Sequence, residues 1–186
     1  MKKIYLLFLV AMSLFIFQAC DENKPAGSPE ATEERLEERM DDDDAEFITK
    51  AASGGMMEVT LGKIAAEKAT SPEVKSFGNH MVTDHSKAND ELKALAASKN
   101  ITLPTMLSED HQKIVDDLST KTGMDFDKAY MEEMVDDHKE DVENFEEAAK
   151  EAKDPDIKAW AAKTVPTLKM HLDMAKTTHE KVKNMK

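Results

Sequence analysis

The feature that most constrains the fold of this chain is a helix-start signal that occurs twice, as SPEVKSF at 71–77 and DPDIKAW at 154–160. Each copy supplies a capping residue, then proline, then an acid, and a helix N-terminus favours all three. Apolar residues recur at helical spacing on both sides of each copy, and no alternating strand pattern reaches a useful length. The sequence therefore predicts an all-α chain in which each signal opens the second helix of an antiparallel hairpin.

Four long helices are expected from this periodicity, over about 45–69, from 72 to 98, from an Asp125 cap to the second signal, and from there to the C-terminus. The connection 99–124 contains NITLP and a shorter helix from near Ser108 to before Gly123, so it is long enough to run the length of a bundle. Two hairpins joined by such a crossover are typical of a ferritin-like four-helix bundle. Pro166 lies inside the last helix and predicts a kink or break there.

The N-terminal residues predict export and a lipid anchor. Lys2 and Lys3 precede an apolar run over 4–17, which is shorter than the roughly 20 residues of a membrane-spanning helix. The single cysteine of the chain, Cys20, follows a small residue directly after this run. We therefore expect a lipoprotein signal peptide over 1–19 and a lipidated Cys20 that holds the protein at the bacterial cell envelope, with its domain in the periplasm or at the cell surface.

Acidic residues dominate the segment after Cys20. Residues 21–44 contain 11 acids and three bases, with two prolines and few apolar side chains, so we expect a disordered linker over 20–44 and a helical domain over 45–186. Removal of the signal peptide leaves 23 basic against 38 acidic residues, a net charge near −15. A charge of this sign repels polynucleotides, so nucleic acid binding is excluded as a function.

Four ionisable side chains lie on the apolar stripes of the four long helices: Glu58, His85, His138 and His171. Glu58 and His85 lie at nearly equal distances along the chain before and after Ser71, and the other two do the same around Asp154. At about 1.5 Å per residue, the members of each pair stand at nearly the same height, roughly 20 and 25 Å from their turns. If the hairpins pack core to core, the four side chains converge near the middle of the bundle.

Such a polar group in a core needs partners, because an isolated buried charge is costly. The four residues can form a buried hydrogen-bonded network that fixes helix register, or they can bind one transition metal ion: zinc, iron or copper. Met81 and Met134 precede two of the histidines by one turn and would favour cuprous copper, although methionine on such a stripe is commonly core filler.

Two similar pentapeptides contain two of these histidines, MVTDH at 81–85 and MVDDH at 134–138. We interpret their likeness first as a sign of a repeated helical hairpin. Asp84 and Asp137 each precede a histidine by one residue, about 100° round the helix, and are therefore expected to be surface or helix-contact acids. His80 and His111 are expected to face solvent.

Several motifs in order resemble the bacterial family known as domain of unknown function 4142. They are GGMMEVTLGKIAAEKA, SPEVKSFGNHMVTDHSKANDELKALA, ITLP, FDKAYMEEMVDDHK and TVPTLKMHL, and they extend from about residue 46 to 178. The resemblance implies a ferritin-like bundle that is exported, and it implies no established activity. Di-iron members of ferritin-like folds use Glu-x-x-His pairs, whereas Val82, Val135 and Leu168 stand three residues before the histidines, which argues against a standard di-iron centre.

Two functions remain open from the sequence. The first is a lipid-anchored envelope protein with a structural or interaction role, binding the membrane through Cys20 and another envelope protein as partner. The second is a metal-binding or metal-dependent redox protein with a mononuclear site of one Glu and three His. No nucleophile stands beside a base and no Gly-rich phosphate loop occurs, so an enzyme is the less favoured class. The sequence does not set the oligomeric state.

Overall fold

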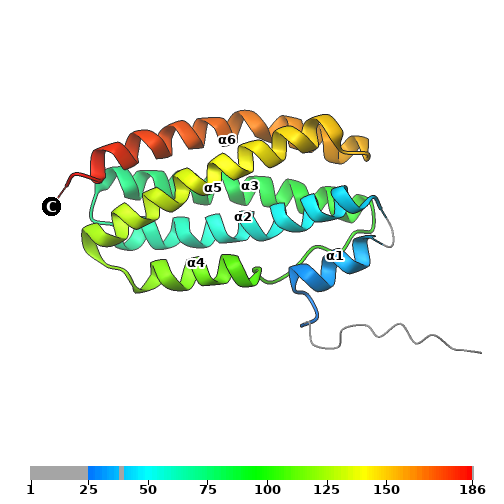
Figure 1. Ribbon diagram of the computed structural model, residues 1–186, viewed down its shortest axis with the longest axis horizontal. Coiled ribbons are helices and arrows are strands. Elements are labelled where there is room, and N and C mark those ends of the chain that lie inside the picture. Colours follow the sequence, from blue (N-terminus) through cyan, green and yellow to red (C-terminus); the bar gives the residue numbers. More distant parts are fainter. Residues whose placement is uncertain (1–24, 38–39, 186) are drawn as a thin grey trace, which may run out of the picture.

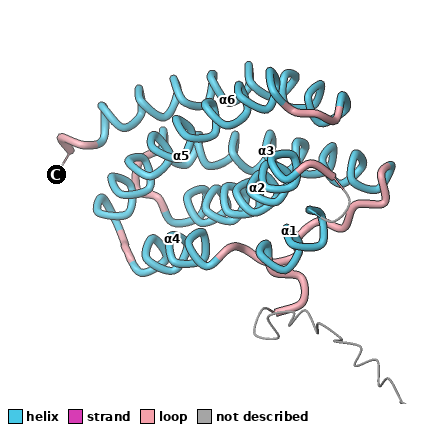
Figure 2. The backbone as a smooth tube through the Cα atoms, turned by 45° about the vertical axis from the view of Figure 1, so that its right-hand side comes forward, coloured by secondary structure: helices cyan, strands magenta, loops and turns pink. Residues whose placement is uncertain are grey.

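The computed structural model describes residues 25–37 and 40–185, and these residues form helices and connecting loops without any strand (Figures 1 and 2). The prediction of an all-α chain is confirmed. The helices, in chain order, are α1 Pro29–Glu37, α2 Asp42–Lys68, α3 Pro72–Ser98, α4 Glu109–Thr120, α5 Gly123–Glu151 and α6 Pro155–Val182.

The four longest helices pack as a bundle of two antiparallel pairs (Figure 1). α2 packs along α3 and α5 packs along α6, while α3 also contacts α6 and α2 contacts α5. The segment 99–122, which includes α4, returns along the length of the bundle, so that α3 and α5 run in the same direction (Figure 1). α1 and α4 lie on the outer side of α2, where α4 also reaches α5.

Most helix starts agree with the sequence. The Ser71 hydroxyl accepts a hydrogen bond from the Glu73 amide, and the Asp154 carboxylate accepts bonds from two amides of the first turn of α6. α5 differs, because it begins at Gly123 rather than at the predicted Asp125 cap. α6 is continuous through Pro166, so the predicted break does not occur.

The predicted disordered linker over 20–44 is wrong for a large part of its length. Residues 29–37 form α1, and α2 already begins at Asp42. Thr32 and Leu36 of α1 are buried, and Leu36 belongs to an apolar cluster with residues of α2 and α6. One buried face is thus enough to order a helix whose remaining surface is charged. The expected signal peptide over 1–19 and Cys20 lie outside the described residues.

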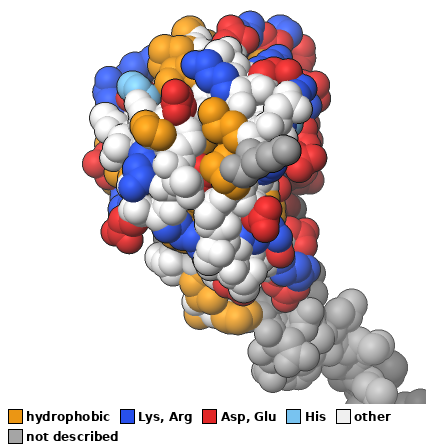
Figure 3. Space-filling model, turned by 90° about the vertical axis from the view of Figure 1, so that its left-hand side faces the viewer, with side chains coloured by type: hydrophobic (Ala, Val, Ile, Leu, Met, Phe, Trp, Pro, Cys, Tyr) orange, Lys and Arg blue, Asp and Glu red, His pale blue; other side chains and the backbone are white. Residues whose placement is uncertain are grey.

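None of the helices in the described part of the chain is long and apolar enough to cross a membrane. Exposed large hydrophobic side chains are few and scattered there: Met106, Met170 and Met185. At the bundle end viewed in Figure 3, acidic and basic side chains are interspersed with small hydrophobic areas.

The apolar core has two parts, one toward each end of the bundle. One cluster includes Met57, Phe77, Met134 and Ala175, and the other includes Ala52, Leu92, Phe145 and Leu168. Along α3, α5 and α6, one of the predicted histidines lies between residues of the two clusters, and in α2 Glu58 directly follows Met57, where one cluster begins. The core is therefore divided by a polar layer.

Two buried aspartates join the hairpins to each other. Asp127 of α5 accepts hydrogen bonds from the amides of Thr70 and Ser71, at 2.6–3.1 Å, in the turn before α3. Asp44 of α2 does the same in the turn before α6, where the amides of residues 153 and 154 donate at 3.1 and 2.7 Å. The two aspartates are separated along the chain by the same interval as the two helix-start signals, so the two arrangements are equivalent parts of the two hairpins.

Small residues allow α2 and α3 to approach closely. A Cβ atom added at Gly78 would lie 2.7 Å from the backbone oxygen of Gly62 and 2.9 Å from the Cβ atom of Ala65. A Cβ atom added at Gly62 would lie 2.8 Å from the backbone oxygen of Gly78. Because the obstacle is backbone, neither position can take a side chain without moving a helix.

Gly78→Ala is therefore expected to lower the free energy of unfolding by about 1–3 kcal/mol, the usual cost of overpacking. Gly54→Ala is the matched control, since its added Cβ would meet only His111 Cε1, at 3.8 Å. The free energy of unfolding of Gly54→Ala is expected to rise by about 0.5–1 kcal/mol, because alanine has a higher helix propensity than glycine. Urea unfolding followed by circular dichroism measures both, and equal effects in the two variants would contradict the close approach.

Candidate metal centre

The four predicted polar residues meet in the layer between the two apolar clusters. Each comes from a different long helix, and their side chains are almost fully buried: Glu58 is 1 % exposed and His138 and His171 are 0 % exposed. The ring centroids of His85, His138 and His171 are 5.1–5.5 Å from one another. The structure thus brings together all four side chains, at the equal heights expected from their spacing.

His85 occupies the middle of a chain of contacts. Its Nδ1 atom lies 2.6 Å from Oε2 of Glu58, and its Nε2 atom lies 3.2 Å from Nδ1 of His171. The other nitrogen of His171, Nε2, lies 2.9 Å from Oδ2 of Asp84. The outer nitrogens, His85 Nδ1 and His171 Nε2, therefore face carboxyl groups, while the inner nitrogens, His85 Nε2 and His171 Nδ1, face each other.

His138 has a different environment. Its Nε2 atom lies 3.4 Å from Oε1 of Glu58, and its Nδ1 atom lies 3.7 Å from Oδ2 of Asp137. Neither nitrogen makes a well-formed hydrogen bond within the described residues, and the same holds for Glu58 Oε1, Asp137 Oδ2 and the Tyr130 hydroxyl, although the Glu58 and Asp137 carboxyl groups are close enough to shift each other's pKa. Buried polar atoms are normally hydrogen-bonded, so a cluster without partners indicates a place where an ion or water completes the structure.

Burial dominates the electrostatics of this layer. It raises the pKa of Glu58 well above its usual value, and the nearby Asp141 raises it further. It lowers the pKa of both His85 and His171 to about 4, and it holds the pKa of His138 well below its ordinary value. Near neutral pH the imidazoles are therefore uncharged, which is the form that binds metal ions.

The contact between the two inner nitrogens depends on where the protons are. With Glu58 protonated, its hydroxyl donates to His85 Nδ1, and His85 Nε2–H can then donate to His171. With Glu58 ionised, His85 Nδ1–H and His171 Nε2–H donate to the two carboxylates, and two lone pairs meet at 3.2 Å. The two nitrogen lone pairs then repel each other unless a cation lies between them. A bound metal ion would therefore favour this distribution of protons.

The spacing also fits metal coordination. Two donor atoms bound at about 2.0–2.1 Å to one tetrahedral ion are about 3.3 Å apart, which is close to the 3.2 Å between His85 Nε2 and His171 Nδ1. The three histidines offer ligand atoms that all lie within 4.8 Å of one another. A carboxylate that accepts from the far nitrogen of a metal-binding histidine is the usual support of such a site, and Glu58 and Asp84 are placed for this role.

A small cavity of about 30 Å³ adjoins the polar layer. Its lining includes Glu58, His85, His171, Asp141 and Trp160. Since roughly 10–15 Å³ of accessible volume is enough to hold one water molecule, this is room for a small ion or one or two waters. The space is too small for an organic cofactor.

Three acids at the centre were not predicted as part of it. Asp84 reaches from α3 to α6 and Asp137 of α5 lies beside Glu58 of α2, so both agree with the helix-contact role, one of the two roles expected for them. Burial raises the pKa of Asp137 well above its usual value and that of Asp141 to about 6. Asp141 could have been found, because it follows Glu58 by the same interval that separates the two helix-start signals.

The same interval corrects the interpretation of the two pentapeptides. MVTDH lies in the second helix of its hairpin and MVDDH in the first helix of the other, so they are not equivalent positions of a repeat. When the two helix-start signals are aligned, His85 corresponds to Leu168 and His138 to Gly55. Their likeness is therefore not the trace of a repeated hairpin.

The remaining side chains considered from the sequence have other roles. Met81 and Met134 are fully buried within one apolar cluster, which agrees with core packing. His80 is exposed as expected. His111 is not solvent-facing as expected, because it is half-buried and its Nδ1 atom lies 2.7 Å from the hydroxyl of Ser53, which links α4 to α2.

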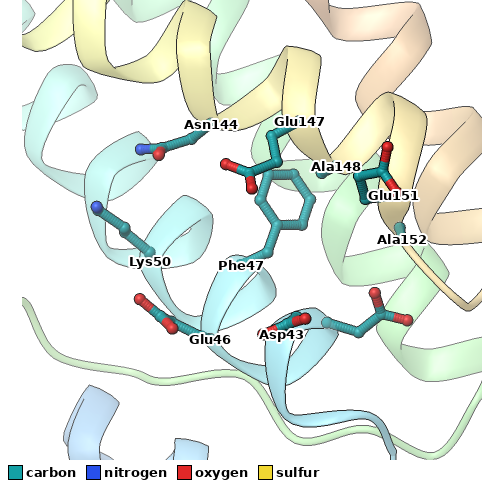
Figure 4. A pocket seen from close by; sticks show the side chains of 10 residues that line it. Asp43, Glu46, Phe47, Lys50, Asn144, Glu147, Ala148, Glu151 and Ala152 are labelled. Atoms are coloured by element: carbon teal, nitrogen blue, oxygen red, sulfur yellow. The ribbon is translucent and has the colours of Figure 1, made fainter.

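A separate pocket of about 200 Å³ lies between the start of α2 and the end of α5 (Figure 4). Phe47 and Glu147 point toward each other across it, and acids surround them. It contains none of the histidines. The pocket therefore lacks the donor set of the polar layer, and the four-residue centre is the stronger candidate.

Comparison with known proteins agrees with the fold. The family described as Domain of unknown function (DUF4142) matches residues 29–178. Among solved structures, the bundle is similar to one titled "CopM in the Cu(II)-bound form", with a TM-score of 0.62 and 16 % identity over 75 % of this chain and 96 % of that one. No curated protein matches the chain. An identity this low shows a shared fold alone.

Proposed function

Since the chain belongs to the DUF4142 family, whose description assigns no activity, we propose a function from the site itself: binding of one transition metal ion within an envelope-located helical bundle. The ligands are His85, His138 and His171, with Glu58 as a fourth ligand or as the acceptor that orients His85. The observation that carries the proposal is the 3.2 Å contact between the inner nitrogens of His85 and His171, each backed by a carboxyl group on its far side.

Zinc, copper and iron all suit imidazole and carboxylate donors, and divalent copper is expected to bind most tightly on general grounds. The similar solved structure is titled as a copper-bound form, which favours copper as the first ion to test. The order of the helices and the long crossover support a ferritin-like relationship. The missing Glu-x-x-His pairs favour a mononuclear site over a di-iron centre.

The direct test is a titration of tag-free, metal-stripped protein with Cu²⁺, Zn²⁺ and Co²⁺. We expect one ion per chain, an intense visible spectrum for Co²⁺ in a tetrahedral site, and a higher melting temperature for the loaded protein. At 100 times the Kd, the added stability is about 2.7 kcal/mol. Metal-free protein with unchanged melting would instead leave the buried hydrogen-bonded network, and a structural role, as the function.

Metal binding near neutral pH is expected to release a proton from Glu58. Burial raises the pKa of this carboxyl well above its usual value, which favours the protonated acid before the cation arrives, so affinity should rise with pH. Isothermal titration in two buffers of different ionisation enthalpy measures the release. Glu58→Gln should reduce it, because the amide can donate to His85 as the acid does but has no proton to lose, and any remaining release would come from Asp137 or Asp141, whose pKa is also raised. Equal release in both proteins would assign the proton elsewhere.

Anchoring at the envelope is the second part of the proposal, and it rests on the signal-like N-terminus and Cys20. Cys20→Ser is expected to move the expressed protein from the membrane fraction to the soluble fraction, since acyl chains supply the attachment. Cell fractionation and immunoblotting measure this. Membrane retention of the variant would contradict the anchor without bearing on metal binding.

A further inference from the structure

An acidic groove of about 510 Å³ lies on the side of the bundle that α1 and α4 partly cover. It is lined by residues of α1, α2, α4 and α5, and eight of them are acids against one lysine. Figure 4 shows two of the lining side chains, Glu46 and Lys50, projecting from the same side of α2. This groove is distinct from the small cavity beside His85 and His171.

Part of this negative charge is not compensated by ion pairs. Glu140 pairs with Lys50 and Asp136 pairs with Lys139, at 2.6 and 2.7 Å, and Asp110 pairs with Lys113. Glu46 and Glu133 have no ion pair among the described residues. Burial raises the pKa of Glu133, and neighbouring carboxylates raise it further, which reflects the negative potential of this surface.

The groove connects to the candidate centre through Asp137. This residue lines the groove, and its carboxyl group also offers a ligand atom within 4.8 Å of those of Glu58 and His138. Its Oδ2 atom is buried and lacks a well-formed hydrogen bond, and the same is true of Glu58 Oε1 and both nitrogens of His138. Thr49 also lines the groove, is 2 % exposed, and has a hydroxyl without a partner.

Polar atoms without partners thus extend from the groove into the core on this side of the bundle. On the opposite side, between α3 and α6, Asp84 is already engaged by His171. We propose that the acidic groove is the loading route of the metal centre: divalent transition metal cations collect between α2 and α5 and reach Glu58 and His138 through Asp137. The proposal rests on the function proposed above, because it supplies that site with its ion.

Metal uptake kinetics test this route. Trp160 is the single tryptophan of the chain and lines the same cavity as His85 and His171, so Cu²⁺ bound there should quench its fluorescence. The test variant is Glu46→Gln with Glu133→Gln, which removes two groove charges that touch none of the ligands. The control variant is Glu67→Gln with Glu143→Gln, which removes two exposed charges from the same two helices outside the groove.

In stopped-flow mixing at low ionic strength, the groove variant should load Cu²⁺ about five-fold or more slowly than wild type, since charged clefts raise on-rates by 10–1,000-fold. The difference should shrink at about 0.5 M salt, where the charges are screened. The stoichiometry and final quenching should not change. The control variant should load at nearly the wild-type rate.

Two results would overturn the proposal separately from the function. If the wild-type protein binds metal and the groove variant loads it at the wild-type rate, the route is rejected and the metal site stands. Equal slowing of the control would show that overall charge matters and the groove does not. Failure of wild-type protein to bind Cu²⁺, Zn²⁺ or Co²⁺ would reject both.

Discussion

Replacing His85 with alanine is expected to abolish stoichiometric metal binding, with a loss of affinity greater than about 100-fold. His85 holds the centre together, because one of its nitrogens contacts Glu58 at 2.6 Å and the other faces His171 at 3.2 Å. The variant removes a ligand atom and also leaves Glu58 buried beside an apolar side chain. Competition with a chelator of known affinity measures the loss.

A graded series makes this result specific. Asp84→Asn keeps the size of the group that supports His171 and is expected to cost about 10–100-fold in affinity, as outer partners of metal-binding histidines do. His80→Ala removes an exposed histidine of the same helix and should change nothing. His85→Gln serves if the alanine variant does not fold. Full affinity in both His85 variants would remove this residue from the site.

Replacing Asp127 with alanine is expected to be strongly destabilising, with a loss of about 3 kcal/mol or more in the free energy of unfolding. The carboxylate is 0 % exposed and accepts hydrogen bonds from the amides of Thr70 and Ser71. Hydrogen bonds to a charged group are worth about 1.5–3 kcal/mol each, and alanine would leave two amides without acceptors. The same acid also lies at the N-terminal end of α3, where negative charge is favourable.

Urea unfolding followed by circular dichroism measures this effect. Asp44→Ala should be similarly costly, because Asp44 binds the equivalent turn before α6. Asp125→Ala is the control, since Asp125 lies in the same helical turn of α5 and is exposed. Equal losses of stability in Asp127→Ala and Asp125→Ala would show that the hydrogen bonds of Asp127 do not join the two hairpins.

Local rules explain why the helices could be predicted from the sequence. The caps at Ser71 and Asp154 and the prolines that follow act within one turn, so neighbouring residues decide them. The exceptions have tertiary causes. α1 is ordered because its buried face packs on α2, although its own composition is that of a linker.

In the candidate site, too, some features follow from local rules and others depend on tertiary packing. Helical rise alone placed Glu58 level with His85, and His138 level with His171, since height along an antiparallel hairpin is fixed by distance from its turn. The acids around them could not be placed in this way. Asp84 reaches the site across the α3–α6 contact, and Asp137 turns inward toward Glu58, and both depend on how the hairpins face each other.

By itself, the sequence determined the helical class, the family, the positions of most helices and the four polar residues of the centre. These follow from periodicity, caps and spacing, which act along one helix or within one hairpin. Only the tertiary structure decided which nitrogen faces which carboxyl group, that Asp44 and Asp127 join the two hairpins, and that an acidic groove reaches the core. Those features arise between helices distant in the sequence, where packing sets the distances and burial sets the charges.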